Sequence, residues 1–286
     1  MRIIKTIKAL RLCLAGFRRK GKTIGFVPTM GYFHKGHISL MKASKKANDI
    51  TVVSLFVNPL QFGPREDLAK YPRDFKRDSL MAKEAGVDIL FCPSPREMYP
   101  GSLLTRISVA EMSQGLCGAS RPGHFEGVAT VVGKLLNIVQ PDVMCLGQKD
   151  AQQVAVLKKM VLDLNFPLKL NVVPTVREPD GLAMSSRNVY LSPSERKEAP
   201  AIYRALKAAR VLILSGELDA TKINSKIKKL ILEGTSASIE YISCVDPDSL
   251  KAVRRIKLPV MVAVAVRFSA ARLIDNIVVT RSIGSP

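Results

Sequence analysis

The first 175 residues alternate between continuous apolar runs and stretches whose apolar residues recur on one side of a helix. The apolar runs predict six strands, at 23–27, 50–57, 87–92, 104–109, 143–146 and 168–173. The one-sided patterns predict helices at 40–47, 75–85, 128–139 and 151–164. Apolar strands that alternate with helices are typical of a parallel sheet covered on both faces.

Residues 1–20 are basic and mildly apolar, as a targeting peptide would be. Their apolar side chains, however, repeat at helical spacing between lysines and arginines, at Ile3, Ile7, Leu10, Leu14 and Phe17. No small-residue cleavage site follows them. We therefore predict an amphipathic helix that belongs to the fold and leads into the first strand.

The pattern changes after residue 175, where helices come first and strands follow. Ser192 and Glu195 form a capping-box pattern, and helical stretches follow at 200–216 and 221–232. Strands are predicted at 239–244, 260–266 and 271–279. The predicted fold class is α/β, with a Rossmann-like parallel-sheet nucleotide-binding domain at 1–175 followed by a smaller α+β lid domain at 176–286.

The formal net charge of +20 would suit a nucleic-acid-binding protein. The surplus is spread over the chain, with 26 Lys and Arg against 13 Asp and Glu up to residue 175, and 18 against 11 beyond it. No dense basic run or zinc-finger spacing occurs, and no apolar run is long enough to span a bilayer. We expect a basic surface without a nucleic-acid or membrane partner.

Five cysteines are dispersed along the chain without a C-x-x-C pair. An odd, scattered set is typical of reduced thiols in a cytoplasmic protein rather than of a disulfide framework or a zinc site. The expected location is therefore the cytoplasm.

The segment from 26 to 37 joins the first predicted strand to a helix through a glycine-containing loop. His34 and His37 lie three residues apart across the helix start, so both rings can face one side of the turn. A helix start offers unpaired N–H groups and the positive end of the helix dipole. The segment predicts a site for phosphate oxygens.

Two later segments suit phosphates in the same way. Lys149 adds a full positive charge at the start of a helix, and Asp150 beside it can accept hydrogen bonds from ribose hydroxyls. The stretch from Met184 to Arg187 offers two hydroxyls and a guanidinium, which can wrap the outer phosphates of a nucleotide. A serine-rich linker is the alternative for this stretch.

Other candidate binding residues lie at the end of a predicted strand or at the start of a predicted helix. Asn58 and Gln61 lie at the end of the second strand, where an amide beside apolar Phe62 could fix a small ligand, although an ordinary turn fits these residues as well. Asp74 and Asp78 share a helix face, which suits either a weak magnesium site or a helix-start charge with a solvated acid.

Several strings of this sequence match motifs of one known family. The loop His34-x-Gly36-His37 resembles the HxGH signature of the nucleotidyltransferase superfamily that includes class I aminoacyl-tRNA synthetases. The longer string PTMGxxHxGH resembles the pantothenate synthetase family much more narrowly. The strings FVNPxQF, LCGxxRPGHFxGV and GxKDxQQ match the same family, and the stretch from Met184 to Arg187 resembles its KMSKS-type loop.

The resemblance implies roles for individual residues. ATP would be bound by Met30, Gly31, Tyr32, Phe33, His34, Lys35, Gly36, His37, Asn58, Gly147, Gln148, Lys149, Asp150, Val176, Met184, Ser185, Ser186 and Arg187. Pantoate and β-alanine would be bound by Pro28, Gln61, Phe62, Arg121, His124 and Gln153. The catalytic set would be His34, His37, Lys149 and Arg187. Tyr32 and Phe33 depart from the smaller residues usual in the family, and we expect them to reshape the pocket wall.

The implied activity is the ATP-dependent ligation of pantoate and β-alanine through a pantoyl-adenylate, with release of AMP and pyrophosphate. Mg²⁺ and a homodimer are further implications of the family. Three alternatives stay open at this point: another HxGH-type nucleotidylyltransferase, a zinc hydrolase using the three histidines, and a basic nucleic-acid-binding protein.

Overall fold

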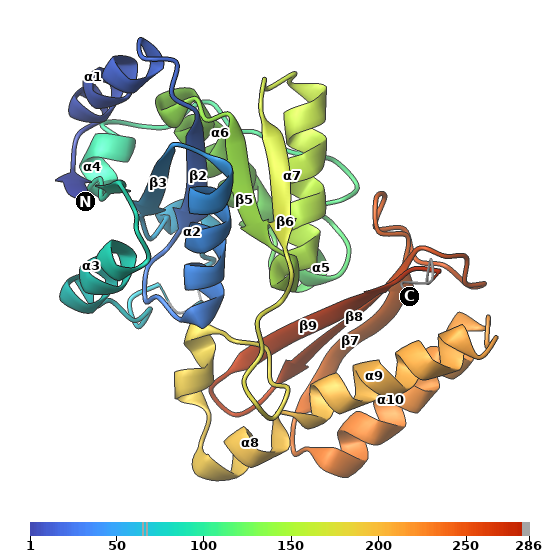
Figure 1. The fold of residues 1–286 in the computed structure, drawn as a ribbon. Coiled ribbons are helices and arrows are strands. Elements are labelled where there is room, and N and C mark those ends of the chain that lie inside the picture. Colours follow the sequence, from blue (N-terminus) through green and yellow to red (C-terminus); the bar gives the residue numbers. More distant parts are fainter. Residues whose placement is uncertain (65, 67, 282–286) are drawn as a thin grey trace.

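The computed structural model describes residues 1–64, 66 and 68–281. Within these residues, strands form two sheets (Figure 1). The larger is parallel, in the order β1-β4-β3-β2-β5-β6, and the smaller is antiparallel, in the order β7-β8-β9. The strands are β1 (Arg2–Ile4), β2 (Ile24–Thr29), β3 (Ile50–Leu55), β4 (Ile89–Phe91), β5 (Val143–Gly147), β6 (Lys169–Val173), β7 (Ser238–Val245), β8 (Val260–Arg267) and β9 (Arg272–Val279).

Helices cover both faces of the parallel sheet, as the alternating pattern predicted. The α-helices are α1 (Ile7–Arg18), α2 (Lys35–Ala47), α3 (Phe75–Glu84), α4 (Pro95–Met98), α5 (Cys117–Ser120), α6 (His124–Val139), α7 (Ala151–Asp163), α8 (Pro193–Glu198), α9 (Ala201–Leu214) and α10 (Ala220–Gly234). Short 3₁₀ turns are η1 (Pro59–Gln61), η2 (Gln148–Asp150) and η3 (Ser186–Tyr190). Phe26 of β2 packs with α1, α6 and α7, whereas Val27 packs with α2 and α3 on the opposite face.

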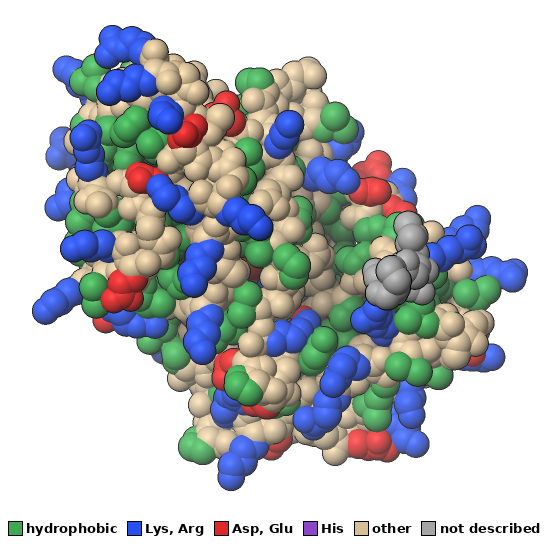
Figure 2. Space-filling model, in the orientation of Figure 1, with side chains coloured by type: hydrophobic (Ala, Val, Ile, Leu, Met, Phe, Trp, Pro, Cys, Tyr) green, Lys and Arg blue, Asp and Glu red, His purple; other side chains and the backbone are tan. Residues whose placement is uncertain are grey.

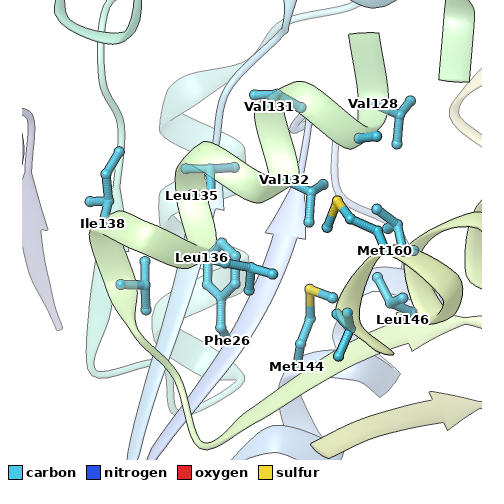
Figure 3. Packing of buried hydrophobic residues seen from close by; sticks show 14 of the residues in the cluster. Phe26, Val128, Val131, Val132, Leu135, Leu136, Ile138, Met144, Leu146 and Met160 are labelled. Carbon is cyan, nitrogen blue, oxygen red and sulfur yellow. The ribbon is translucent and has the colours of Figure 1, made fainter. Parts of the chain in front are cut away.

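Helix α6 packs deeply against the larger sheet. Val132, Leu135 and Leu136 lie next to Phe26 and Met144 of the central strands (Figure 3). This close packing anchors the helix, and with it the loop that leads into its first turn.

The strand order places two chain segments at one point of the sheet. The chain moves from β2 outward to β3 and β4, and then returns to the other side of β2 to form β5. β2 and β5 are therefore neighbours whose following loops diverge, which is the position where open parallel sheets bind ligands. These loops carry the predicted phosphate motifs at 30–37 and 147–150.

The smaller sheet has a core of its own, and β8 is buried on both faces. Val262 and Val264 pack with α9 and α10, whereas Met261 and Ala263 point the other way, against Ala151 at the start of α7. In Figure 1 the small sheet lies between these two helices and the larger sheet. Strand β8 thus holds the second half of the chain to the first.

Two predictions at the ends of the larger sheet were wrong. Residues 104–109 form no strand: Leu104 is 92% exposed, and the segment runs as a loop tied by the N–H of Ile107 to the hydroxyl of Thr130. The N-terminal helix begins at Ile7, because the Thr6 side chain accepts from the Ala9 N–H and caps it there. The residues before it, including Ile3, form β1 beside β4.

The surface agrees with a dispersed charge. Lys and Arg side chains are scattered over the face of the molecule in Figure 2 and do not gather over one element. Among the described residues, no helix is long and apolar enough to cross a membrane.

We predict that Gly127→Ala destabilises the protein. A Cβ atom at Gly127 of α6 would lie 2.3 Å from the carbonyl oxygen of Leu60 in η1, so helix and turn would have to separate. The free energy of unfolding should fall by about 1–3 kcal/mol in urea denaturation.

The matched control is Gly16→Ala in α1, where nothing lies within 4 Å of the added atom. Because alanine favours a helix over glycine, this variant should gain up to about 1 kcal/mol. Equal effects of the two substitutions would contradict the close approach of α6 and η1.

Candidate active site

The two histidines of the first motif build the start of α2. The Nδ1 atom of His34 accepts from the Gly36 N–H at 3.1 Å, and Nδ1 of His37 accepts from the His34 N–H at 3.3 Å. The ring centroids lie 4.1 Å apart. A Cβ atom at Gly36 would lie 2.8 Å from the His34 ring, so the spacing H-x-G-H requires glycine at its third position.

Both imidazoles are neutral hydrogen-bond donors. Because each Nδ1 accepts a hydrogen bond, the ring proton of the neutral form lies on Nε2. Burial, and next the charge of Lys149, lowers the pKa of His34 to about 4. Burial and the neighbouring His34 hold the pKa of His37 well below its ordinary value. At neutral pH the rings therefore offer N–H groups and no charge.

Asp78 of α3 holds the loop that precedes His34. The residue is 1% exposed, and its carboxylate accepts from the N–H groups of Tyr32 and Phe33, both at 2.7 Å. Burial raises the pKa of this carboxyl group. The expectation of a solvated acid is therefore wrong for Asp78, whereas Asp74 caps α3 by accepting from the Arg77 N–H.

The side chains of Tyr32 and Phe33 do not form the pocket wall that we expected. Phe33 is fully buried in the core under α2, and the Arg77 guanidinium lies 5.0 Å from the Tyr32 ring centroid. The magnesium role suggested for Asp74 and Asp78 stays a prediction, and among the described residues no group of three His, Cys, Asp or Glu is placed to hold a metal ion.

The second phosphate motif follows β5. Lys149 lies in η2, and its Nζ atom is 3.3 Å from Oδ1 of Asp150. Gln148 does not face the same space: its side chain donates to Asn276 of β9 at 3.0 Å. Gln148 was predicted to contact the nucleotide, but its side chain points to the small sheet instead.

The serine-rich stretch folds back over the cleft. The backbone N–H of Met184 donates to the carbonyl of Val176, and Ser185 caps η3 by accepting from the Arg187 N–H. The hydroxyl of Ser186 lies 3.4 Å from that of Tyr71. The stretch is thus an ordered turn and not a linker.

Asn58 supports the site from behind. It is 1% exposed, its amide donates to the carbonyl of Gly127 and to Gln61, and its oxygen accepts from the Tyr99 hydroxyl. Asn58 also lines a small cavity of about 140 Å³ together with His37, Gln61 and Gln153, and its predicted contact with the nucleotide stays a prediction. Gln61, oriented in this way, places its Nε2 atom 2.8 Å from the Met30 sulfur.

Arg121 and His124 form a network that fixes the other side of Gln61. Arg121 makes two hydrogen bonds of 2.7 Å to Glu66, and a third nitrogen lies 2.9 Å from Nε2 of His124. Nδ1 of His124 donates to the Gln61 carbonyl at 2.8 Å, so Nε2 accepts from Arg121. Burial and Arg121 lower the pKa of His124 to about 4.

The motifs meet around one cavity of about 180 Å³. Of the residues predicted to bind ligands, those that line it are Pro28, Met30, His34, Gly36, His37, Gln61, Phe62, Arg121, His124, Gly147, Lys149, Asp150, Gln153, Val176, Met184, Ser185, Ser186 and Arg187. A neighbouring cavity of about 500 Å³ shares several of these and extends to the small sheet. The predicted residues outside both cavities are Gly31, Tyr32, Phe33, Lys35, Asn58, Gln148, Asp74 and Asp78.

Sequence reasoning missed several residues of the cleft. Tyr71 lines the smaller cavity, and Arg272, Asp275 and Asn276 of β9 line the larger one. The signal for β9 was present, because Asp275 and Asn276 interrupt a strand that is otherwise apolar after Arg272. A polar pair in such a strand is buried only where partners exist.

Known proteins resemble this chain over nearly its whole length. A pantothenate synthetase of Geobacillus sp. (strain WCH70) is 53% identical over 277 residues, which cover 97% of this chain and 98% of that protein. The pantothenate synthetase of Heliobacterium modesticaldum is 54% identical over 279 residues, which cover 98% and 99%.

Solved structures agree in fold. Pantothenate synthetase from Thermus thermophilus has a TM-score of 0.93 and 45% identity, covering 98% of this chain and 100% of that one. A pantoate-β-alanine ligase from Francisella tularensis, complexed with β-γ ATP and β-alanine, has a TM-score of 0.79 and 37% identity, covering 97% of each chain. The profile of the family described as pantoate-beta-alanine ligase matches residues 2–278, and this chain therefore belongs to that family.

Proposed function

We propose that this chain joins pantoate to β-alanine in an ATP-dependent ligation that yields pantothenate, AMP and pyrophosphate. The observation that carries the proposal is the single cavity in which His34, His37 and Lys149 meet two glutamines, Gln61 and Gln153. Groups that can bind phosphates therefore lie next to amides that can bind a small hydroxy acid. Identities of 53% and 54% to pantothenate synthetases support the same activity.

In the first step the carboxylate of pantoate attacks the α-phosphorus of ATP. A new P–O bond forms, the bond to the bridging oxygen breaks, and pyrophosphate leaves with the electron pair. Charge grows on the α-phosphate and on the leaving group. The Nε2–H groups of His34 and His37, with Lys149 and Arg187, are the groups we assign to stabilise it.

In the second step the uncharged amine of β-alanine attacks the acyl carbon of the pantoyl-adenylate. A C–N bond forms, the C–O bond to AMP breaks, and the nitrogen loses a proton to solvent or to the departing phosphate. The cleft has to exclude water at this stage, because water would hydrolyse the mixed anhydride. No covalent intermediate with the protein is required.

Several features are part of the proposal through the family resemblance. Mg²⁺ would enter bound to the phosphates of ATP and share the stabilisation of charge. A homodimer in the cytoplasm is expected. The domain boundary near residue 175 is supported by the separate cores of the two sheets.

The activity is tested by measuring AMP release from ATP with pantoate alone, with β-alanine alone and with both. Multiple turnover should require both acids, since the adenylate stays bound until an amine attacks it. Absence of AMP release with both substrates would overturn the proposed function.

We predict that His37→Ala lowers the adenylation rate at least about 100-fold, because it removes a donor aimed at developing charge. Pantoate-dependent exchange of labelled pyrophosphate into ATP measures this step. His37→Gln is the matched variant, since glutamine at this helix position can still bond to the His34 N–H. Because glutamine also keeps an N–H donor, a rate that survives in His37→Gln but not in His37→Ala fits the donor role, whereas an unchanged rate in His37→Ala would contradict it.

Gln153→Ala should raise the KM for pantoate about 10-fold or more while leaving the KM for ATP within about twofold, because an amide that binds a substrate hydroxyl contributes roughly 1.5 kcal/mol. Gln152→Ala is the neighbouring control. The Gln152 side chain bonds to Cys117, Met112 and Gly115 and lines only the larger cavity. A selective loss of ATP affinity in Gln153→Ala would contradict its assignment.

The histidines should make the native protein less stable in acid. The pKa values of His34 and His124 are lowered to about 4, whereas an unfolded chain takes up these protons near 6.5. Between these limits the unfolded state binds more protons, so stability falls as the pH drops from about 6.5 to about 4. NMR of the three histidine rings measures the native pKa values, and titration near 6.5 would contradict the buried, neutral rings.

A further inference from the structure

The turn that carries Lys149 is held by a side chain from the second half of the chain. The N-terminal ends of η2 and α7 lack a side-chain cap. Gly147 precedes η2 and has no side chain, and the side chain of Asp150, which precedes α7, makes no capping hydrogen bond. Instead, the amide nitrogen of Asn276 in β9 donates to the carbonyls of Gln148 at 3.0 Å and Lys149 at 2.9 Å. Both donors of this amide are thus used on one turn.

The same amide is fixed from its other end. Its oxygen accepts from Nε2 of Gln148 at 3.0 Å, and the residue is 4% exposed. Asn276 pairs with Ala263 across the strands, and Ala263 packs against Ala151, directly after the turn. Polar and apolar contacts therefore position β9 on the turn together.

The neighbouring residue in β9 secures the third phosphate motif. Asp275 is 5% exposed and binds Arg177 with two hydrogen bonds, at 2.6 and 3.0 Å. The Arg177 guanidinium lies 3.5 Å from the ring centroid of Tyr203. Arg177 is bridged to Ala183, immediately before the stretch from Met184 to Arg187. Two consecutive residues of one strand thus tie down two phosphate motifs.

We propose that Asn276 is a positioning residue for adenylation: it sets the backbone of the turn at Gln148 and Lys149, and so aims the Lys149 ammonium at the phosphates of ATP. The inference rests on the proposed function. If the inference is correct, the second half of the chain helps to shape the nucleotide site in addition to its predicted role as a lid. A displacement of about 1 Å in such a group is enough to lower a rate by roughly 100-fold.

The test compares Asn276→Ala with Val264→Ala. Val264 is 1% exposed in the core under α9 and α10, so its truncation weakens the same sheet without touching the turn. Pantoate-dependent pyrophosphate exchange should fall about 10- to 100-fold in Asn276→Ala and less than about twofold in Val264→Ala. Aminolysis of adenylate already formed on the enzyme should change little in either variant. Equal exchange rates in the two variants would overturn the proposal.

A double-mutant cycle distinguishes positioning of Lys149 from a general structural role. If Asn276 acts through Lys149, adding Asn276→Ala to Lys149→Ala should lower exchange by less than about twofold more. Losses that multiply would refute the coupling. Should Asn276→Ala fail to fold, Gln148→Ala removes one of the three side-chain bonds and leaves β9 intact. It should lower exchange about 3- to 10-fold, and an unchanged rate would count against the proposal.

The wild-type protein separates this inference from the proposed function. If it turns over ATP with both acids while Asn276→Ala keeps the full exchange rate, only the role of Asn276 is lost. If the wild type shows no turnover, the proposed function is lost first.

Discussion

The parallel pairing of β2 with β5 is the constraint on which the site depends. It brings the loop with His34 and the turn with Lys149 to the same edge of the sheet, although more than a hundred residues separate them in the chain. Helix α2 can follow β2 closely because Gly25 lacks a side chain: a Cβ atom there would lie 2.2 Å from the Ser44 hydroxyl. This close approach packs the C-terminal end of α2 against β2, while the caps by His34 and His37 fix where the helix begins.

Desolvation decides what the groups at this edge contribute. A buried imidazole next to a lysine loses its proton, so His34 and His37 supply directed N–H groups. The formal positive charge comes from Lys149 and Arg187. Arg121 is paired with Glu66 and also donates to His124. Its principal effect is to hold the backbone at Gln61, so a residue that looks cationic in the sequence acts as a support.

Local sequence predicted the elements whose partners lie close in the chain, and it predicted most of the cavity. The strand, loop and helix around His34 follow from apolar pattern and glycine placement alone, and the family motifs identified the lining residues. It failed where the outcome depends on distant contacts. The spacing of Ile3 fits a helix, but the residue pairs with β4 at the edge of the sheet. The apolar run 104–109 fits a strand, but it pairs with no strand of the sheet. Gln148 and Asp78 were predicted at the site, yet Gln148 bonds to Asn276, and Asp78 bonds to the backbone of the loop, so neither lines the cavity.

The small side chain of Ala263 has a consequence for how the two halves of the molecule meet. Ala263 pairs with Asn276 across the strands and packs against Ala151, so its size sets the distance between β8 and α7. A bulkier residue at this position would push β9 away from the nucleotide turn and widen the larger cavity, which Ala263 and Asn276 both line.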